Sequence, residues 1–225
     1  VRIRDAATGA LLATLKEHND RVAMFAFSPS GDELYVPSWD KKLSIWNLTT
    51  YEKERVIDEF EAELSSVVVS PDGQWVAIAE SDAVIQIRER ATWKKSHTIR
   101  TPDGARWPAL NFTHNGNVLL TRTHEGVVRA YHASSGQLLA VDDVRPEGKL
   151  FESALSPNGE ELAAAGLSGS VTLWSLKGVF DFKILPLGMF RTSVYPSIFL
   201  EKKKLIATPG ADGMLYVWNR DTGEL

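Results

Sequence analysis

Short apolar runs alternate along this chain with turn residues. Val22 to Phe27 and Leu34 to Val36 flank the turn Ser28-Pro29-Ser30-Gly31, where proline and glycine occupy positions that turns favour. Leu43 to Trp46 and Lys53 to Ile57 follow after further turn residues. Runs of about four to eight residues rich in Val, Ile, Phe, Tyr and Trp are typical of antiparallel strands. Because no helical period is sustained, the pattern predicts an all-β chain.

These strand-like segments recur with a fixed period. Six of them end at residues 4, 46, 88, 131, 174 and 218, at intervals of 42, 42, 43, 43 and 44 residues. The turns that begin at Ser28, Ser70, Thr113 and Ser156 keep step, at intervals of 42, 43 and 43. Units of about 40–45 residues with four strands each are typical of β-propeller blades. The sequence therefore predicts four-stranded antiparallel blades, with about five repeats visible.

The chain resembles the WD-repeat β-propeller family over essentially its whole length. The resemblance implies a hydrogen-bonded blade network of a His, a Ser or Thr, an Asp and a Trp. The first complete unit has His18, Ser38, Asp40 and Trp46 at these positions. A buried carboxylate and a buried indole N–H need partners, which an imidazole and a hydroxyl can supply. We expect these four residues to be structural.

The later units depart from this network. The second unit keeps Asp82 but has Glu80 and Arg88 at the Ser and Trp positions. The third unit has Thr123, Glu125 and Tyr131 at the Ser/Thr, Asp and Trp positions. The fourth keeps Trp174 but has Ser168 at the Asp position. The fifth keeps Asp212 and Trp218 but has Gly210 in place of the hydroxyl residue. Two interpretations of the degenerate second and third units stay open, namely that they bind something or that they tolerate drift.

The strand count predicts a propeller larger than these residues. About 21 strands are expected, whereas a seven-bladed ring needs about 28 and a six-bladed ring about 24. We expect residues 1–225 to form a single propeller domain, an incomplete part of a seven-bladed ring, with six blades as the alternative. The chain starts at Val1 in mid-strand, so we also expect an excerpt of something longer.

Composition narrows the functional classes. Lys and Arg number 25 against 29 Asp and Glu, and the charges are dispersed, so no global basic field for nucleic acid is present. No apolar run approaches the ~18 residues that suggest a membrane span. The absence of cysteine excludes disulfides, thiolate metal sites and a cysteine nucleophile. We expect a cytoplasmic protein with no nucleic-acid partner.

The sequence predicts neither an enzyme nor a cofactor site. The four histidines other than His18 lie in separate segments without ligands at metal spacing. The Ser-rich stretch at Gly166 to Ser170 falls where every unit has a turn, and no phosphate-binding glycine motif occurs. Two lysine runs, Lys94-Lys95 and Lys202-Lys203-Lys204, are expected on bottom-face turns as solvated tips, with an anionic partner as the alternative.

The opposite, top face gathers the turns between second and third strands and the connections between blades. Its candidate partner-binding residues are Trp39, Arg21, Arg106, Lys149 and His124. Trp and Arg are enriched at interface hot spots. The alternative for Trp39 is that its ring folds over its own blade.

The resemblance implies a non-catalytic scaffold whose top-face loops dock protein or peptide partners. The alternative is a regulatory or sensor domain of a larger multidomain signalling protein. An enzyme with a substrate in the central channel is disfavoured, because inner-strand residues such as Val67 to Val69 are mainly apolar.

Overall fold

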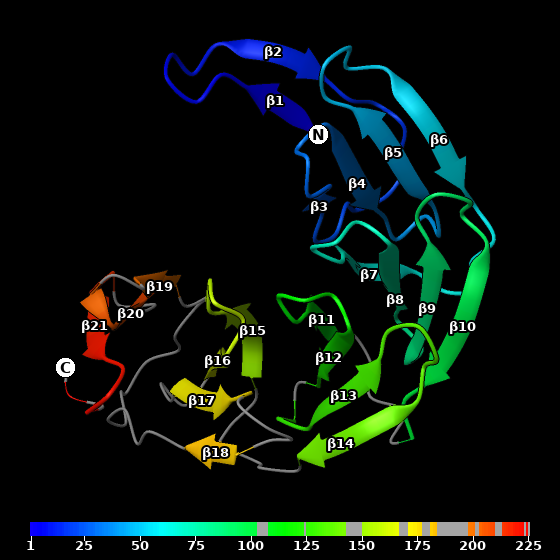
Figure 1. Cartoon of the computed structure of the whole chain (residues 1–225). Helices are drawn as coiled ribbons and strands as arrows, with labels where there is room; N and C mark the ends of the chain where they lie inside the picture. Colours follow the sequence, from blue (N-terminus) through cyan, green and yellow to red (C-terminus); the bar gives the residue numbers. More distant parts are fainter. Residues whose placement is uncertain are drawn as a thin grey trace. The chain divides into compact units, whose positions relative to one another are not determined.

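The computed structural model describes residues 1–102, 108–123, 125–142, 150–166, 171–176, 181–183, 198–200, 203–209, 213–222 and 224. Over these residues the chain consists almost entirely of strands and turns, and within each sheet every strand pairs antiparallel with its neighbours in sequence (Figure 1). The all-β prediction is confirmed.

The chain divides into two compact units. The first comprises Val1–Val69 with Gly73–Trp107, and the second Ser70–Asp72 with Pro108–Leu225. The first unit holds a two-stranded sheet, β1-β2, and two four-stranded sheets, β3-β4-β5-β6 and β7-β8-β9-β10. Its strands are β1 (Arg2–Arg4), β2 (Leu11–Thr14), β3 (Ala26–Phe27), β4 (Glu33–Pro37), β5 (Leu43–Asn47), β6 (Lys53–Ile57), β7 (Leu64–Val69), β8 (Trp75–Glu80), β9 (Val84–Glu89) and β10 (Lys95–Arg100).

The second unit holds two more four-stranded sheets and a three-stranded one. Its strands are β11 (Ala109–Phe112), β12 (Val118–Arg122), β13 (Val128–His132), β14 (Leu138–Asp142), β15 (Leu150–Leu155), β16 (Glu161–Gly166), β17 (Val171–Ser175), β18 (Asp181–Lys183), β19 (Ile198–Leu200), β20 (Leu205–Pro209) and β21 (Leu215–Asn219). The predicted four-stranded blades are confirmed. The single-domain organisation and the number of blades stay predictions.

The strand register reproduces the sequence repeat. In each of the five sheets that follow β1-β2, the residue that marks the period lies opposite a buried aliphatic residue of the preceding strand. These pairs are Leu34 with Trp46, Val76 with Arg88, Leu119 with Tyr131, Leu162 with Trp174 and Ile206 with Trp218. The period of 42 to 44 residues is therefore the spacing of one blade.

The first complete blade, β3 to β6, buries both of its faces. Alternate residues along a strand point to opposite faces, and two apolar clusters result. One contains Leu34 and Trp46 with β1 and β2 residues such as Ile3, whereas the other joins Tyr35 and Leu43 to the β7–β8 sheet. A polar contact also links the β3–β6 sheet to the β7–β10 sheet, because Arg90 Nη2, just after β9, lies 2.8 Å from Glu33 Oε2 in β4. The sheet β3 to β6 therefore packs against β1 and β2 on one face and against β7 and β8 on the other.

The innermost strand of this blade is shorter than the sequence predicted. Val22 to Phe27 was expected as one strand, but β3 covers only Ala26–Phe27, preceded by isolated bridges at Val22 and Met24. Pro37 in the neighbouring β4 has no N–H, which removes one hydrogen bond from the ladder. In the next sheet Ala79 stands at this position and β7 is continuous over six residues.

Candidate functional site

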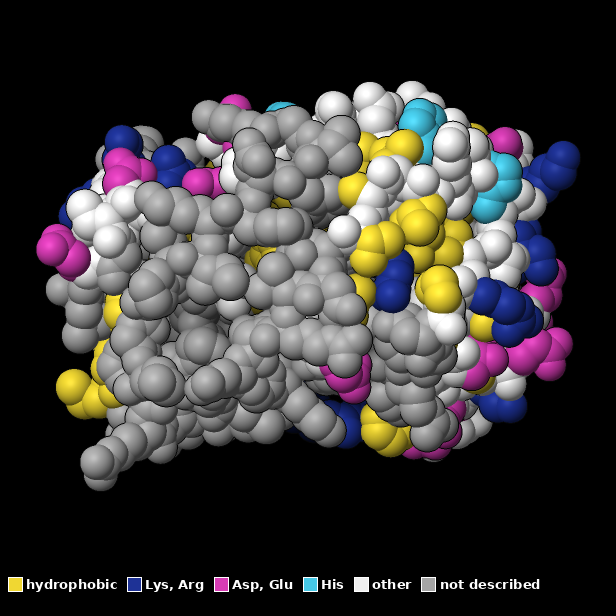
Figure 2. Space-filling view, turned by 90° about the horizontal axis from the view of Figure 1, so that it is seen from below, with side chains coloured by type: hydrophobic (Ala, Val, Ile, Leu, Met, Phe, Trp, Pro, Cys, Tyr) yellow, Lys and Arg dark blue, Asp and Glu magenta, His cyan; other side chains and the backbone are white. Residues whose placement is uncertain are grey.

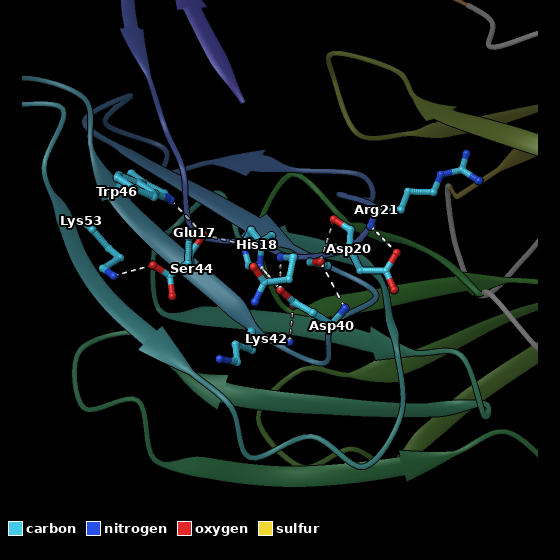
Figure 3. A network of polar contacts seen from close by, with 11 residues as sticks. Glu17, His18, Asp20, Arg21, Asp40, Lys42, Ser44, Trp46 and Lys53 are labelled. Carbon is cyan, nitrogen blue, oxygen red and sulfur yellow. Dashed lines mark hydrogen bonds and ion pairs between the residues drawn. The ribbon is translucent and has the colours of Figure 1, made fainter.

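A chain of hydrogen bonds runs through the first complete blade (Figure 3). His18, in the connection between β2 and β3, places Nδ1 3.1 Å from both carboxylate oxygens of Asp40 in the turn after β4. His18 Nε2 lies 2.7 Å from Ser44 Oγ, and Trp46 Nε1 donates to the same oxygen at 2.8 Å. Three of the four predicted network residues, His18, Asp40 and Trp46, are therefore brought together.

The hydroxyl that joins His18 to Trp46 is that of Ser44, which the sequence analysis did not name, whereas the predicted Ser38 contacts Asp40. Ser44 and Trp46 are two residues apart on β5, so their side chains share one face of the sheet. Ser38 Oγ accepts the Asp40 backbone N–H at 3.2 Å and donates to Asp20 O at 3.5 Å, so Ser38 joins the network through Asp40. The spacing of two from Trp46 was the sequence signal that could have identified Ser44.

Asp40 fastens the connection between blades to the turn. Burial raises the pKa of its carboxyl, but hydrogen bonds from the Asn19 backbone and from His18 outweigh burial, so the pKa is lowered overall. The Asn19 N–H donates to Oδ2 at 3.0 Å and the Lys42 N–H to Oδ1 at 3.2 Å. The ionised carboxylate thereby ties the connection before β3, at Asn19, to the turn after β4, at Lys42.

The second complete blade carries a different network at the same positions. Gln86 Nε2 donates to Glu80 Oε1 at 2.9 Å, and Arg88 Nη2 donates to the Gln86 side-chain oxygen at 3.0 Å. Glu80 Oε2 accepts the backbone N–H groups of Glu61 at 2.9 Å and Ala62 at 3.1 Å. Glu80 therefore anchors the connection before β7 as Asp40 anchors the one before β3. In this unit a network of Glu80, Gln86 and Arg88 therefore replaces the His, Ser, Asp and Trp network of the first complete blade.

The corresponding positions of the other blades are described only in part. Tyr131 is buried and Thr123 Oγ1 accepts the Val127 N–H at 3.2 Å. Trp174 and Trp218 are fully buried. The predicted positions Ser168, Gly210 and Asp212 lie outside the described residues.

Arg21 and Trp39 form the described part of the predicted partner-binding surface. The Trp39 backbone N–H donates to Arg21 O at 2.9 Å, and the guanidinium carbon of Arg21 lies 4.9 Å from the centre of the Trp39 ring. Arg21 is exposed and Trp39 is partly buried. Figure 3 shows the Arg21 side chain extending away from the His18–Asp40 network. The other candidates, Arg106, Lys149 and His124, lie outside the described residues.

No group of three or more His, Cys, Asp or Glu residues in the described part of the chain is placed to hold a metal ion. No helix among the described residues has the length and apolarity needed to cross a membrane. On the described part of the face in Figure 2, basic and acidic side chains are interspersed.

Comparison with known proteins identifies the repeat. Residues 9–47 match the family described as WD domain, G-beta repeat. The chain is 25% identical over 177 residues to small ribosomal subunit protein RACK1y of Oryza sativa, covering 74% of this chain and 51% of that protein. It is 26% identical to pre-mRNA-processing factor 19 homolog 2 of Arabidopsis thaliana, covering 80% and 34%. It is 31% identical to the human U3 small nucleolar RNA-associated protein 18 homolog, covering 70% and 29%.

The chain therefore spans about half or less of the length of these relatives. Their names refer to a ribosomal subunit, to pre-mRNA processing and to a nucleolar RNA. These names give the predicted cytoplasmic location no clear support.

Proposed function

Because the chain belongs to the WD-repeat family, we propose that it is a non-catalytic scaffold that docks a peptide or protein partner on the top-face surface around Arg21 and Trp39. The observation that carries this proposal is the stacked pair itself, with the guanidinium 4.9 Å from the ring centre. Trp and Arg side chains that are large and partly preorganised are the types that dominate interface energies.

Hydrogen bonds of the blade network hold the backbone next to Arg21 and Trp39. Asp40 follows Trp39 directly and accepts hydrogen bonds from Asn19 and Lys42, so the backbone beside the ring is held in place. The Arg21 carbonyl accepts the Trp39 N–H, which ties the connection between blades to the turn. Because this backbone is already held, binding a partner orders less of the chain around the Arg–Trp pair and so costs less entropy.

The test needs a probe of defined composition. We would select peptides from a displayed library on the chain and measure their affinities for wild type, Trp39→Ala and Arg21→Glu. Each change is expected to weaken binding at least about tenfold, since hot-spot truncations reach that size. Trp75→Ala, at the start of β8 and thus at the opposite end of a blade, is the matched control. If all variants remain folded and bind the peptides equally, the proposed surface is wrong.

A second candidate is the regulatory or sensor arm of a larger multidomain protein. The observation that favours it is the low coverage of the relatives, of which the chain spans 51% at most among the three named. Sequencing the transcript of the natural protein would decide, because a non-repetitive domain joined to the blades favours the arm and further repeats favour the stand-alone scaffold.

A further inference from the structure

A cavity of about 350 Å³ lies between the outer strand β6 and the hairpin that joins β9 to β10. The residues that line it are Arg55, Val56, Ile57, Asp58, Glu59, Arg88, Thr92, Trp93, Lys94 and Lys95. It therefore includes Lys94-Lys95, one of the two lysine runs for which the sequence left an anionic partner open.

The charges around this cavity do not balance. Four cationic side chains, those of Arg55, Arg88 and the two lysines, line it together with only two carboxylates, Asp58 and Glu59. A third carboxylate nearby, Glu89, does not line the cavity and accepts a hydrogen bond from Thr92 Oγ1 at 3.0 Å. Two positive charges thus remain in excess at the cavity wall.

Arg88 gives this excess a fixed geometry. Its side chain is only 5% exposed, and its guanidinium donates from Nη1 to Trp93 O at 3.1 Å and from Nη2 to Gln86 at 3.0 Å. Among the described residues Arg88 Nε is buried without a hydrogen-bond partner. A buried guanidinium with an unused donor is costly unless an acceptor approaches it.

The ion pair that Arg88 does make is readily exchanged. Nη2 lies 3.1 Å from Glu59 Oε2, but the Glu59 side chain is 72% exposed. An exposed carboxylate on a loop is held weakly, because solvent screens the attraction and ordering the side chain costs entropy. Glu59 can therefore give way to a more highly charged anion.

We propose that this cavity binds a phosphate monoester or free phosphate as the dianion, in place of Glu59. Without Glu59 the wall carries three positive charges in excess, of which a dianion neutralises two and a single carboxylate only one. Arg88 provides, from a rigid position, the Nη2 donor that Glu59 accepts, and Lys94 and Lys95 provide mobile point charges, a combination suited to phosphate oxygens.

This inference does not rest on the proposed function. Neither Arg21 nor Trp39 lines the cavity, so Trp39→Ala is expected to leave phosphate binding unchanged. Failure of peptide docking and failure of phosphate binding are thus separate results.

The test uses the whole chain and three probes: inorganic phosphate, O-phosphoserine and serine. Binding is followed at constant ionic strength by the NMR signal of the Trp93 indole, which lines the cavity, assigned with Trp93→Phe. Saturable shifts with both phosphates and none with serine are expected. Tighter binding of O-phosphoserine than of inorganic phosphate would identify a phosphate monoester as the ligand, and the reverse order would identify the free ion.

Variants separate a built site from general attraction. The double change Lys94→Gln and Lys95→Gln is expected to weaken phosphate binding at least about tenfold, because two charged contacts are lost. The matched control, Lys16→Gln with Lys203→Gln, removes the same charge at two residues that do not line the cavity and should leave the affinity within about twofold. Glu59→Gln should tighten binding by about threefold or more, because it removes the competing carboxylate.

The pH dependence of the ligand's affinity is an independent test of the dianion. O-Phosphoserine loses its second charge below about pH 6, so its affinity should fall there, whereas that of sulfate, whose charge is constant, should not. The proposal is overturned if no saturable shift occurs in the folded chain, if the two double variants weaken binding equally, or if Glu59→Gln weakens it.

Discussion

At the scale of single residues, Ser44 is the member of the blade network whose substitution we expect to reduce stability most. Its hydroxyl serves His18 Nε2 and Trp46 Nε1 at once, so Ser44→Ala leaves two buried nitrogens unpaired. We expect a loss of about 1–3 kcal/mol in the free energy of unfolding, measured by urea denaturation. Ser38→Ala is the matched control and should cost less, because its contacts are 3.2 and 3.5 Å long. An equal or larger loss at Ser38 would contradict this assignment.

The carboxyl of Asp40 makes stability depend on pH. Its pKa is lowered in the folded chain from the ordinary value of 3.8, so the unfolded chain binds the proton more readily. The contribution is therefore present above about pH 4 and is lost as the pH falls through the lower, folded pKa. Asp40→Asn should flatten the acid limb of a plot of unfolding free energy against pH. Some slope remains, because hydrogen bonds from Ser30 and Ser28 also lower the pKa of Asp32. An unchanged limb would show that Asp40 carries no such coupling.

The residues of the site were predictable only where the family chemistry is retained. His18, Asp40 and Trp46 could be placed because their types and spacing match one pattern. The network of Glu80, Gln86 and Arg88 could not, because a carboxylate, an amide and a guanidinium replace the usual groups and only the register brings them together. The sequence marks Arg88 as a departure from the family pattern, but its position in a cavity depends on β6 and β9, which are distant in the sequence.

At the scale of elements, the glycine turns between inner and second strands differ in what lies beside them. Gly31 and Gly159 both have positive φ, +78° and +71°. A Cβ at Gly159 would lie 2.4 Å from His114 Cβ and 2.9 Å from its backbone nitrogen, whereas a Cβ at Gly31 would meet nothing within 4 Å. Gly31→Ala should therefore cost only the backbone strain of about 1 kcal/mol, and Gly159→Ala clearly more. Differential scanning calorimetry of the two variants checks this, and equal melting temperatures would refute the close packing of the turn at 159.

Most strands were predictable to within a residue or two, because turn residues and apolar runs delimit them. β6 agrees with its predicted range, Lys53–Ile57. The exception, β3, shows why some could not be placed: the run from Val22 to Phe27 is β-prone, but its pairing depends on Pro37 in the adjacent strand. Strand formation is decided by the partner strand as much as by the segment itself.

At the scale of the whole molecule, the repeat period predicted the blade but could not predict how many blades close a ring, because each blade contacts only its neighbours. Stability should therefore be distributed along those neighbour contacts. The first complete blade lets this be tested, since Leu34 and Leu43 are buried to 1% and 0% exposure on its opposite faces. Leu34 packs with residues of β1 and β2, and Leu43 with residues of β7 and β8.

Each leucine truncated to alanine should lose about 2–5 kcal/mol of unfolding free energy, because each leaves a cavity in a packed cluster. The two variants should differ in which strands lose protection from hydrogen exchange. Native-state hydrogen exchange should show reduced protection in β1 and β2 for Leu34→Ala and in β7 and β8 for Leu43→Ala, with β4 and β5 affected in both. Since the variants make the same chemical change in the same sheet, each serves as the control for the other. An identical exchange pattern in both would mean that these sheets open as one cooperative body and that the nearest-neighbour description does not apply to them.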